Sequence, residues 1–216
     1  MRQRLHGLLS SERVVVDLRH YFGIGLPSGM AAFTGSRFEH LAGGGDRPEV
    51  ADRFTAEDLA AVQTLSVTVP ASVGLDLLEG RLGAQLSGLL QAIPWDIDMV
   101  DAEADVLAEG SPADQAWHLL CAQYGVDWVI AGKLLGRKRP RLLPVYDRVV
   151  RCALSRPRPS FWLALHAALR ADDLALHRHL LALRQVAGVP ETVGALRVCD
   201  VAVWMRHRAE RHACPR

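Results

Sequence analysis

The chain has 216 residues, of which 50% are hydrophobic and 23% charged, with 25 Lys and Arg against 24 Asp and Glu. This length and apolar fraction are enough for one sizeable core, and they exclude a globally disordered chain. Its apolar runs are short and broken by charges or glycines, so we expect no membrane span and no membrane association.

The N-terminal twenty residues begin with basic side chains. Ser11, Glu12 and Arg13 interrupt their apolar stretch, so we predict no signal peptide. A cytoplasmic, monomeric protein is the resulting expectation.

Cysteine and histidine spacing gives no metal motif. The four cysteines are Cys121, Cys152, Cys199 and Cys214, without a CxxC pair, and we expect reduced thiols. His177 and His179 share no ligand spacing with a cysteine or a carboxylate. We therefore predict no metal ligands, no iron–sulfur cluster and no other cofactor.

Apolar residues recur at spacings of three and four, which predicts a mostly α-helical fold. Two β-branched segments near the N-terminus, residues 14–17 and 66–69, are candidate short strands, and the second reads equally well as a linker between helices. The glycine-rich loop 42–46 separates an N-terminal extension, residues 1–50, from a helical domain, residues 51–216, on which we expect it to pack.

Helix boundaries are marked at several points. Thr55 precedes AEDLAAVQTL with Asp58 three positions on, which is typical of a capping box. Pro70 stands where a first helical residue is expected, ahead of ASVGLDLLEG. The acidic stretch 95–109 lacks calcium-loop spacing, so a solvated helix or loop is expected rather than a metal site.

A pair of short helices is predicted around a tight turn at residues 125–127. Ser111 and Pro112 open the first helix, which should run to Tyr124. Asp127 is a predicted N-cap for the second, WVIAGKLLG, whose abrupt start would present backbone N–H groups that favour a phosphate. Further helices are expected over residues 159–170, 172–187 and 191–211.

Charge is unevenly distributed. Residues 1–127 hold eighteen acidic and eight basic side chains, whereas residues 128–216 hold six acidic and seventeen basic ones. This asymmetry predicts a polyanionic partner; the alternative is that the halves neutralise each other. Between residues 128 and 171, Asp147 is the only acid among ten bases. Such a field would attract a phosphate backbone, beside which a carboxylate can stabilise a developing cation or orient a water.

Residues 120–151 resemble the helix-hairpin-helix DNA glycosylase superfamily. YGVDWVIA matches the hairpin of that superfamily through Gly125, Val126 and Ala131. LPVYDRVVR matches its catalytic-aspartate segment through Pro144, Val145, Asp147, Val149 and Arg151. Two positions depart from the pattern: Val129 stands where lyase-type members have a lysine, and Asp127 stands where the second hairpin glycine is usual.

The resemblance implies a glycosylase-like helical bundle, with the helix-hairpin-helix at residues 114–151, that binds double-stranded DNA with one base flipped out. Asp147 would be the catalytic carboxylate, and the missing lysine implies a monofunctional enzyme in which water attacks the sugar. The expected DNA-binding residues are Gly125, Val126, Asp127, Lys133, Arg137, Lys138, Arg139, Arg141, Arg148 and Arg151. Tyr124, Trp128, Tyr146 and Trp95 are the candidates for stacking on the base, and the segment FTGSRFE, residues 33–39, would help to line the pocket.

Other functions stay open. The chain also fits a non-catalytic helix-hairpin-helix DNA-binding module, in which Asp147 only pairs with neighbouring arginines, or a helical enzyme or scaffold that does not bind nucleic acid. The sequence defines neither the base nor the setting, which is repair, self-protection or phage defence. The wider chain, including FTAEDLAAVQTLSV and LRVCDVAVWM, also resembles an uncharacterised bacterial family of about this length.

Overall fold

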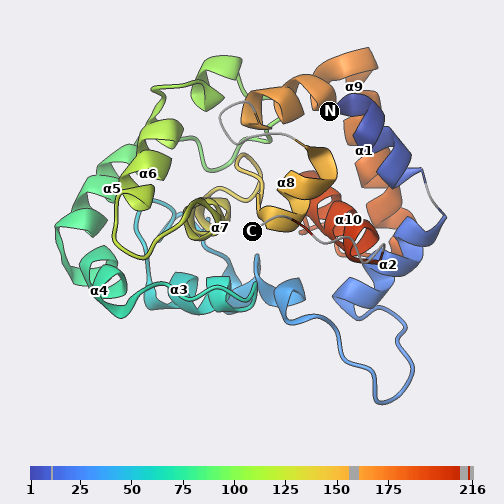
Figure 1. Cartoon of the computed structure of the whole chain (residues 1–216), viewed down its shortest axis with the longest axis horizontal. Helices are drawn as coiled ribbons and strands as arrows, with labels where there is room; N and C mark the ends of the chain where they lie inside the picture. Colours follow the sequence, from blue (N-terminus) through green and yellow to red (C-terminus); the bar gives the residue numbers. More distant parts are fainter. Residues whose placement is uncertain (11, 156–160, 210–213, 215–216) are drawn as a thin grey trace. The chain divides into compact units, whose positions relative to one another are not determined.

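A computed structural model describes residues 1–10, 12–155, 161–209 and 214 (Figure 1). Over these residues the chain forms α- and 3₁₀-helices joined by turns and loops, without a β-strand, so the predicted mostly helical fold class is confirmed. None of the described helices combines the length and hydropathy needed to cross a bilayer. The chain divides into two compact units, Met1–Ser36 with Tyr146–Arg216 (unit 1) and Arg37–Val145 (unit 2).

Unit 1 is organised around its C-terminal helix, α10 (Ala195–Ala209). This helix contacts α1 (Arg2–Leu9), α2 (Arg13–Phe22), α8 (Arg148–Leu154) and α9 (Phe161–Ala187). The consecutive side chains of Val201, Ala202 and Val203 are all buried. Since consecutive residues face different sides of a helix, this part of α10 is enclosed on all sides, as expected of a core helix.

Helix α2 replaces the first candidate strand. Val14, Leu18 and Tyr21 are buried on it, at the spacing that places side chains on one helix face. The helical spacing of the buried residues along the whole segment therefore determines its structure, although the segment begins with β-branched residues. The second candidate, residues 66–69, forms a turn and a linker between α3 (Ala56–Gln63) and α4 (Ala71–Glu79). Neither segment is a strand, and the alternative interpretation of residues 66–69 as a linker between helices is confirmed.

Helix α9 contains the predicted break. Its dihedral angles are non-helical from Ala171 to Leu174, and Asp172, Asp173 and Leu174 have φ values of 50°, 53° and 60°. The two helices predicted over residues 159–170 and 172–187 are thus the two arms of one kinked element. The predicted start at residue 159 and the predicted end of the last helix at residue 211 lie outside the described residues.

Unit 2 is organised around α7 (Trp128–Lys138), which contacts α3 and α6 (Pro112–Cys121). Helix α6 also contacts α5 (Arg81–Gln91), and α4 contacts α5. Three short 3₁₀-helices complete the described secondary structure: η1 (Thr34–Arg37), η2 (Leu41–Gly43) and η3 (Ala104–Leu107). Nearly all of α7 is buried, including its charged C-terminal end, so it is the core helix of unit 2.

The helix starts of unit 2 follow the sequence signals. Thr55 and Asp58 form the predicted capping box of α3. Ser111 caps α6 by accepting a hydrogen bond from the Asp114 N–H at 3.2 Å. Pro70 is the residue before α4 rather than its first residue. Helix α6 ends at Cys121, three residues before the predicted end, because the chain turns there toward Gly125.

The division into units differs from the predicted boundary at residue 50. The first 36 residues belong to unit 1, with the C-terminal segment. The glycine-rich loop 42–46 is part of unit 2 and packs closely: a Cβ at Gly45 would lie 2.5 Å from the carbonyl oxygen of Arg137. This loop therefore packs within unit 2, against the end of α7.

Candidate functional site

The hairpin between α6 and α7 has the local form that the sequence predicts. Gly125 has a φ of +79°, which L side chains rarely adopt. A Cβ there would also meet Cγ of Pro70 at 2.9 Å. Gly125 is thus required for a sharp turn packed against the residue that precedes α4.

Substitution of Gly125 by alanine should destabilise unit 2 by about 2–3 kcal/mol, through left-handed strain and the clash with Pro70. Gly110 is a matched control, because its φ is +78° and a Cβ there would meet nothing within 4 Å. Gly110→Ala should cost only about 1 kcal/mol. Urea unfolding of the two variants measures the difference, and equal losses would show that the Pro70 contact is unimportant.

Asp127 caps the N-terminus of α7. Its Oδ1 accepts hydrogen bonds from the backbone N–H groups of Val129 and Ile130, both at 3.0 Å. The amides that a phosphate would need are therefore satisfied by a carboxylate, whose negative charge also repels a phosphate. Val126 is buried. This geometry does not support the phosphate contacts predicted for Gly125, Val126 and Asp127.

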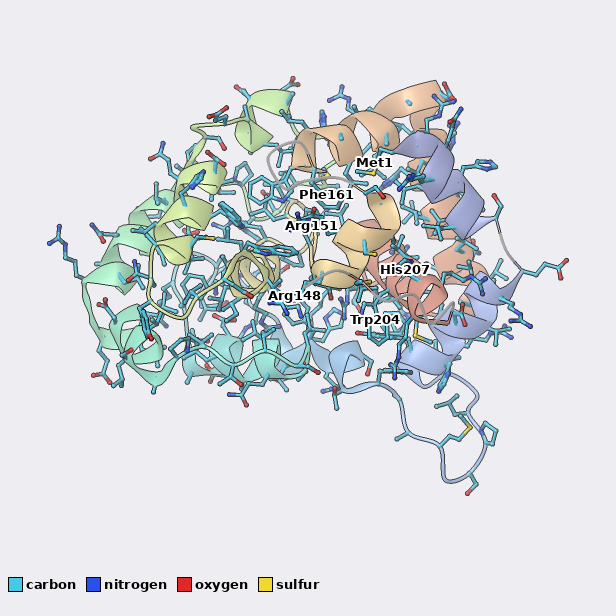
Figure 2. The ribbon with its side chains drawn as sticks, in the orientation of Figure 1. Met1, Arg148, Arg151, Phe161, Trp204 and His207 are labelled. Carbon is cyan, nitrogen blue, oxygen red and sulfur yellow. The ribbon has the colours of Figure 1, made fainter. Side chains whose placement is uncertain are left out.

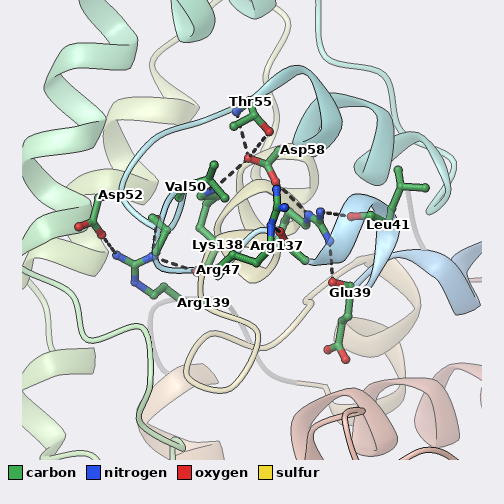
Figure 3. A network of polar contacts seen from close by, with 12 residues as sticks. Glu39, Leu41, Arg47, Val50, Asp52, Thr55, Asp58, Arg137, Lys138 and Arg139 are labelled. Carbon is green, nitrogen blue, oxygen red and sulfur yellow. Dashed lines mark hydrogen bonds and ion pairs between the residues drawn. The ribbon is translucent and has the colours of Figure 1, made fainter.

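Arg137 lies inside unit 2 and is saturated with internal acceptors (Figure 3). Its Nε donates to Oδ1 of Asp58 at 2.9 Å. Its two terminal nitrogens donate to the carbonyl oxygens of Phe38, Glu39 and Leu41 at 2.6–2.7 Å. These hydrogen bonds hold residues 38–41, near the start of unit 2, against the C-terminal end of α7.

Lys138 and Arg139 are buried in the same way. Nζ of Lys138 donates to Oδ2 of Asp58 at 2.9 Å and to the carbonyl oxygen of Val50 at 2.7 Å. Burial lowers the pKa of Lys138, and Asp58 opposes this shift. Arg139 donates to Asp52 at 2.7 Å and, at 2.5–2.9 Å, to the carbonyl oxygens of Leu90, Ile93, Ala51 and Lys138.

Four cations predicted to bind DNA are therefore structural. Arg137, Lys138 and Arg139 are at most 1% exposed. Lys133 is also buried and donates to the carbonyl oxygen of Leu65 at 2.9 Å. Their donors are buried and bound to internal acceptors, so the structure does not support the DNA contacts predicted for these four residues. In unit 2, Arg141 stays partly exposed and pairs with Asp98 at 2.9 Å.

Asp147 lies in unit 1 as the N-cap of α8. Its Oδ1 accepts hydrogen bonds from the N–H groups of Val149 at 2.9 Å and Val150 at 3.0 Å, which fix the carboxylate. The side chain is half-buried. Arg148 and Arg151 lie on the same helix (Figure 2), and both are exposed. The predicted catalytic residue is thus held rigidly at the surface beside two accessible arginines.

The predicted base-stacking residues have different environments. Tyr124 is 96% exposed, Trp95 is 37% exposed and Trp128 is half-buried, all in unit 2. Tyr146 is buried in unit 1 and stacks on Phe161 with ring centroids 4.2 Å apart. Burial raises the pKa of Tyr146 to about 12. Its ring is occupied by this core contact, so its predicted stacking on a base is not supported.

The segment FTGSRFE contributes to packing. Phe33 stacks on Tyr21 at 5.3 Å and meets the edge of Trp204 at 5.7 Å, within unit 1. Phe38 is fully buried in unit 2.

A hollow of about 380 Å³ in unit 1 is lined by residues of α1 and α9, including His6 and Asp172. None of the predicted site residues lines this hollow.

Unit 1 contains a cysteine–histidine cluster that the sequence did not predict. One ligand atom each of Cys152, His207 and Cys214 lies within 4.8 Å of the other two. Burial, a hydrogen bond with Cys152 and the charges of Cys152 and Asp147 raise the pKa of Cys214 to about 11. The sequence could indicate this cluster only through the seven-residue separation of His207 and Cys214. Cys152 lies far from both in the sequence.

Comparison with known proteins gives a family but no activity. No curated protein and no solved structure matches the chain. One sequence family matches residues 14–207, a range that includes Asp58, Asp147, Cys152 and His207 but ends before Cys214. This agrees with the resemblance of the wider sequence to an uncharacterised family. The chain belongs to the family of unknown function DUF6308.

Proposed function

We propose that the protein is a monofunctional DNA glycosylase that hydrolyses the N-glycosidic bond of a damaged or modified base in double-stranded DNA. The observation that carries the proposal is the placement of Asp147. Its carboxylate is fixed at the start of α8, beside the exposed Arg148 and Arg151, within the segment that resembles a catalytic-aspartate motif.

The mechanism uses the exposed cations and the carboxylate. Arg148 and Arg151 attract the phosphates on either side of the target nucleotide. The nucleotide is flipped out of the stack. As the bond to the base breaks, Asp147 stabilises the cationic sugar and orients the attacking water.

Water is the proposed nucleophile because the position of the catalytic lysine in lyase-type enzymes carries no amine here. Val129, at the lysine position of lyase-type enzymes, is apolar and buried in unit 2. Within unit 2, Tyr124 and Trp95 are exposed and Trp128 is half-buried, which leaves these aromatic side chains accessible for stacking. The product should be a free base and an intact strand with an abasic site. Repair, self-protection and phage defence are the settings in which such a product is useful.

A base-release assay tests the proposal. The full chain is incubated with duplexes that carry oxidised, deaminated, alkylated or bulky phage-type bases. Mass spectrometry then detects free base, and strands are analysed before and after alkali. Release of one base with strand cleavage only after alkali is the expected result. Strand cleavage without alkali would contradict the monofunctional mechanism.

The two exposed arginines should contribute measurably to DNA affinity. Replacing both Arg148 and Arg151 with alanine removes two phosphate contacts, so the slope of log affinity against log salt should fall by about 2. Arg178→Ala is a matched control, because Arg178 is exposed on α9 and pairs with Asp173. Fluorescence anisotropy at several salt concentrations measures the slopes, and an unchanged slope would exclude α8 from the DNA-binding face.

A non-catalytic DNA-binding module is the second candidate. The observation that favours it is that Asp147 and Asp127 make the same cap contacts, each with two backbone N–H groups. A purely structural cap needs nothing more. Salt-dependent DNA binding without release of any base, by both the wild type and Asp147→Asn, would support this candidate. Absence of DNA binding at low salt would instead favour a scaffold that does not bind nucleic acid.

A further inference from the structure

Three potential metal ligands from distant parts of unit 1 meet at one point. Cys152 lies on α8, His207 lies on α10 (Figure 2), and Cys214 follows that helix. Zinc bonds of about 2.3 Å to sulfur and 2.0–2.1 Å to nitrogen place tetrahedral ligand atoms about 3.5–3.8 Å apart. The separations here, all within 4.8 Å, exceed this by at most about 1.3 Å, which side-chain rotation can close.

The donor set matches the chemistry of one metal. Two thiolates and one imidazole suit Zn²⁺, whereas calcium and magnesium prefer oxygen ligands. His207 is buried, while Cys152 and Cys214 are partly exposed, so an ion can enter from solvent and bind a rigid inner ligand.

We propose that Cys152, His207 and Cys214 bind one zinc ion, which joins α8 to α10 and to the chain that follows α10. Three protein ligands leave one tetrahedral position for water. The ion fixes α8, the helix that Asp147 caps, against the core helix of unit 1. This site is independent of the proposed glycosylase activity, because it needs neither DNA nor catalysis by Asp147.

Zinc binding is tested with the reduced full chain. The protein is stripped of metal and titrated with Zn²⁺ in the presence of a chromophoric chelator. One zinc per chain is expected for the wild type, and Cys152→Ser and Cys214→Ser should each weaken binding at least about 100-fold. Cys121→Ser, which alters a half-exposed cysteine of unit 2, is the matched control and should bind zinc like the wild type.

Two further readouts keep the test independent of misfolding. Cys214 lies outside the helices, so Cys214→Ser should leave the far-ultraviolet circular dichroism unchanged. Co²⁺ in place of zinc should give thiolate charge-transfer bands and tetrahedral d–d bands in the wild type, with reduced intensity in each cysteine variant. Equal zinc affinity in the wild type and both cysteine variants, or a cobalt spectrum without thiolate bands, would overturn the proposal.

Discussion

Replacing Asp58 with asparagine is expected to lower the free energy of unfolding by about 3–5 kcal/mol. Asp58 is fully buried, and its carboxylate pairs with both Arg137 and Lys138 at 2.9 Å. It also accepts a hydrogen bond from the Thr55 N–H at 3.0 Å, in the capping box of α3. The neutral side chain would leave two buried cations without a counter-charge. Urea unfolding followed by circular dichroism measures the loss.

Asp52→Asn is the control for this prediction. Asp52 pairs with Arg139 at 2.7 Å, but its own side chain is 41% exposed. Arg139 also keeps its carbonyl acceptors, so the loss should be about 1 kcal/mol or less. Similar losses in the two variants would show that the buried pairing around Asp58 is not what stabilises unit 2.

The Asp58→Asn defect should also shrink in alkaline solution. The pKa of Lys138 is lowered by burial in the folded chain, and losing Asp58 removes the attraction that opposes this shift. When the folded pKa of a base lies below its unfolded value, the folded state binds fewer protons, so stability rises with pH through that interval. The stability difference between the wild type and Asp58→Asn should therefore be smaller at about pH 9.5 than at about pH 7. A constant difference would contradict a charged, buried Lys138.

Asp147→Asn is expected to slow base release by at least about 10²-fold while the protein remains folded. Asparagine caps helices about as well as aspartate, so α8 keeps its N-cap. The lost charge at the helix N-terminus should cost no more than about 1 kcal/mol of stability. The variant therefore separates the catalytic role of the carboxylate from its structural role.

Asp127→Asn is the matched control, because Asp127 makes the same pair of cap contacts at the start of α7. Its substitution removes one negative charge from an N-cap without touching the proposed catalytic group. Base release by this variant should equal that of the wild type. A comparable loss in both variants would attribute the effect to helix capping rather than to catalysis.

The helices of unit 2 were the most predictable part of the fold. Thr55, Ser111 and Asp127 mark helix starts through hydrogen bonds within three residues, and such local interactions can be read from sequence alone. The strand at residues 14–17 failed because β-propensity depends on packing partners, whereas the buried spacing of Val14, Leu18 and Tyr21 extends over the whole helix.

The fate of the basic run at Arg137, Lys138 and Arg139 could not be read from sequence. Their carboxylate partners, Asp58 and Asp52, lie 79–87 residues upstream. The same pattern of charges describes a solvated DNA-binding face and a set of buried anchors, because only tertiary structure determines the burial. Much of the predicted basic field is thus used inside unit 2, as the alternative of internal neutralisation anticipates.

The surroundings of Asp147 were only partly predictable. Its place in a motif followed by Arg148 and Arg151 is visible in the sequence, and the three lie together because they are adjacent in the chain. Cys152, His207 and Cys214 meet only because α8 packs on α10, so linear spacing contained no ligand motif. The first 36 residues form one unit with the C-terminal segment. Linear spacing gave no sign of this either, because the contacts join residues that are far apart in the sequence.

Single-turnover base release by the wild type and Asp147→Asn, with DNA affinity measured on the same duplex, tests the central claim most directly. The proposed mechanism predicts free base and an abasic site from the wild type, and a rate at least about 10²-fold lower from the variant, with DNA affinity little changed. Equal rates of release, or DNA binding by both proteins without release from any duplex, would contradict Asp147 as a catalytic carboxylate.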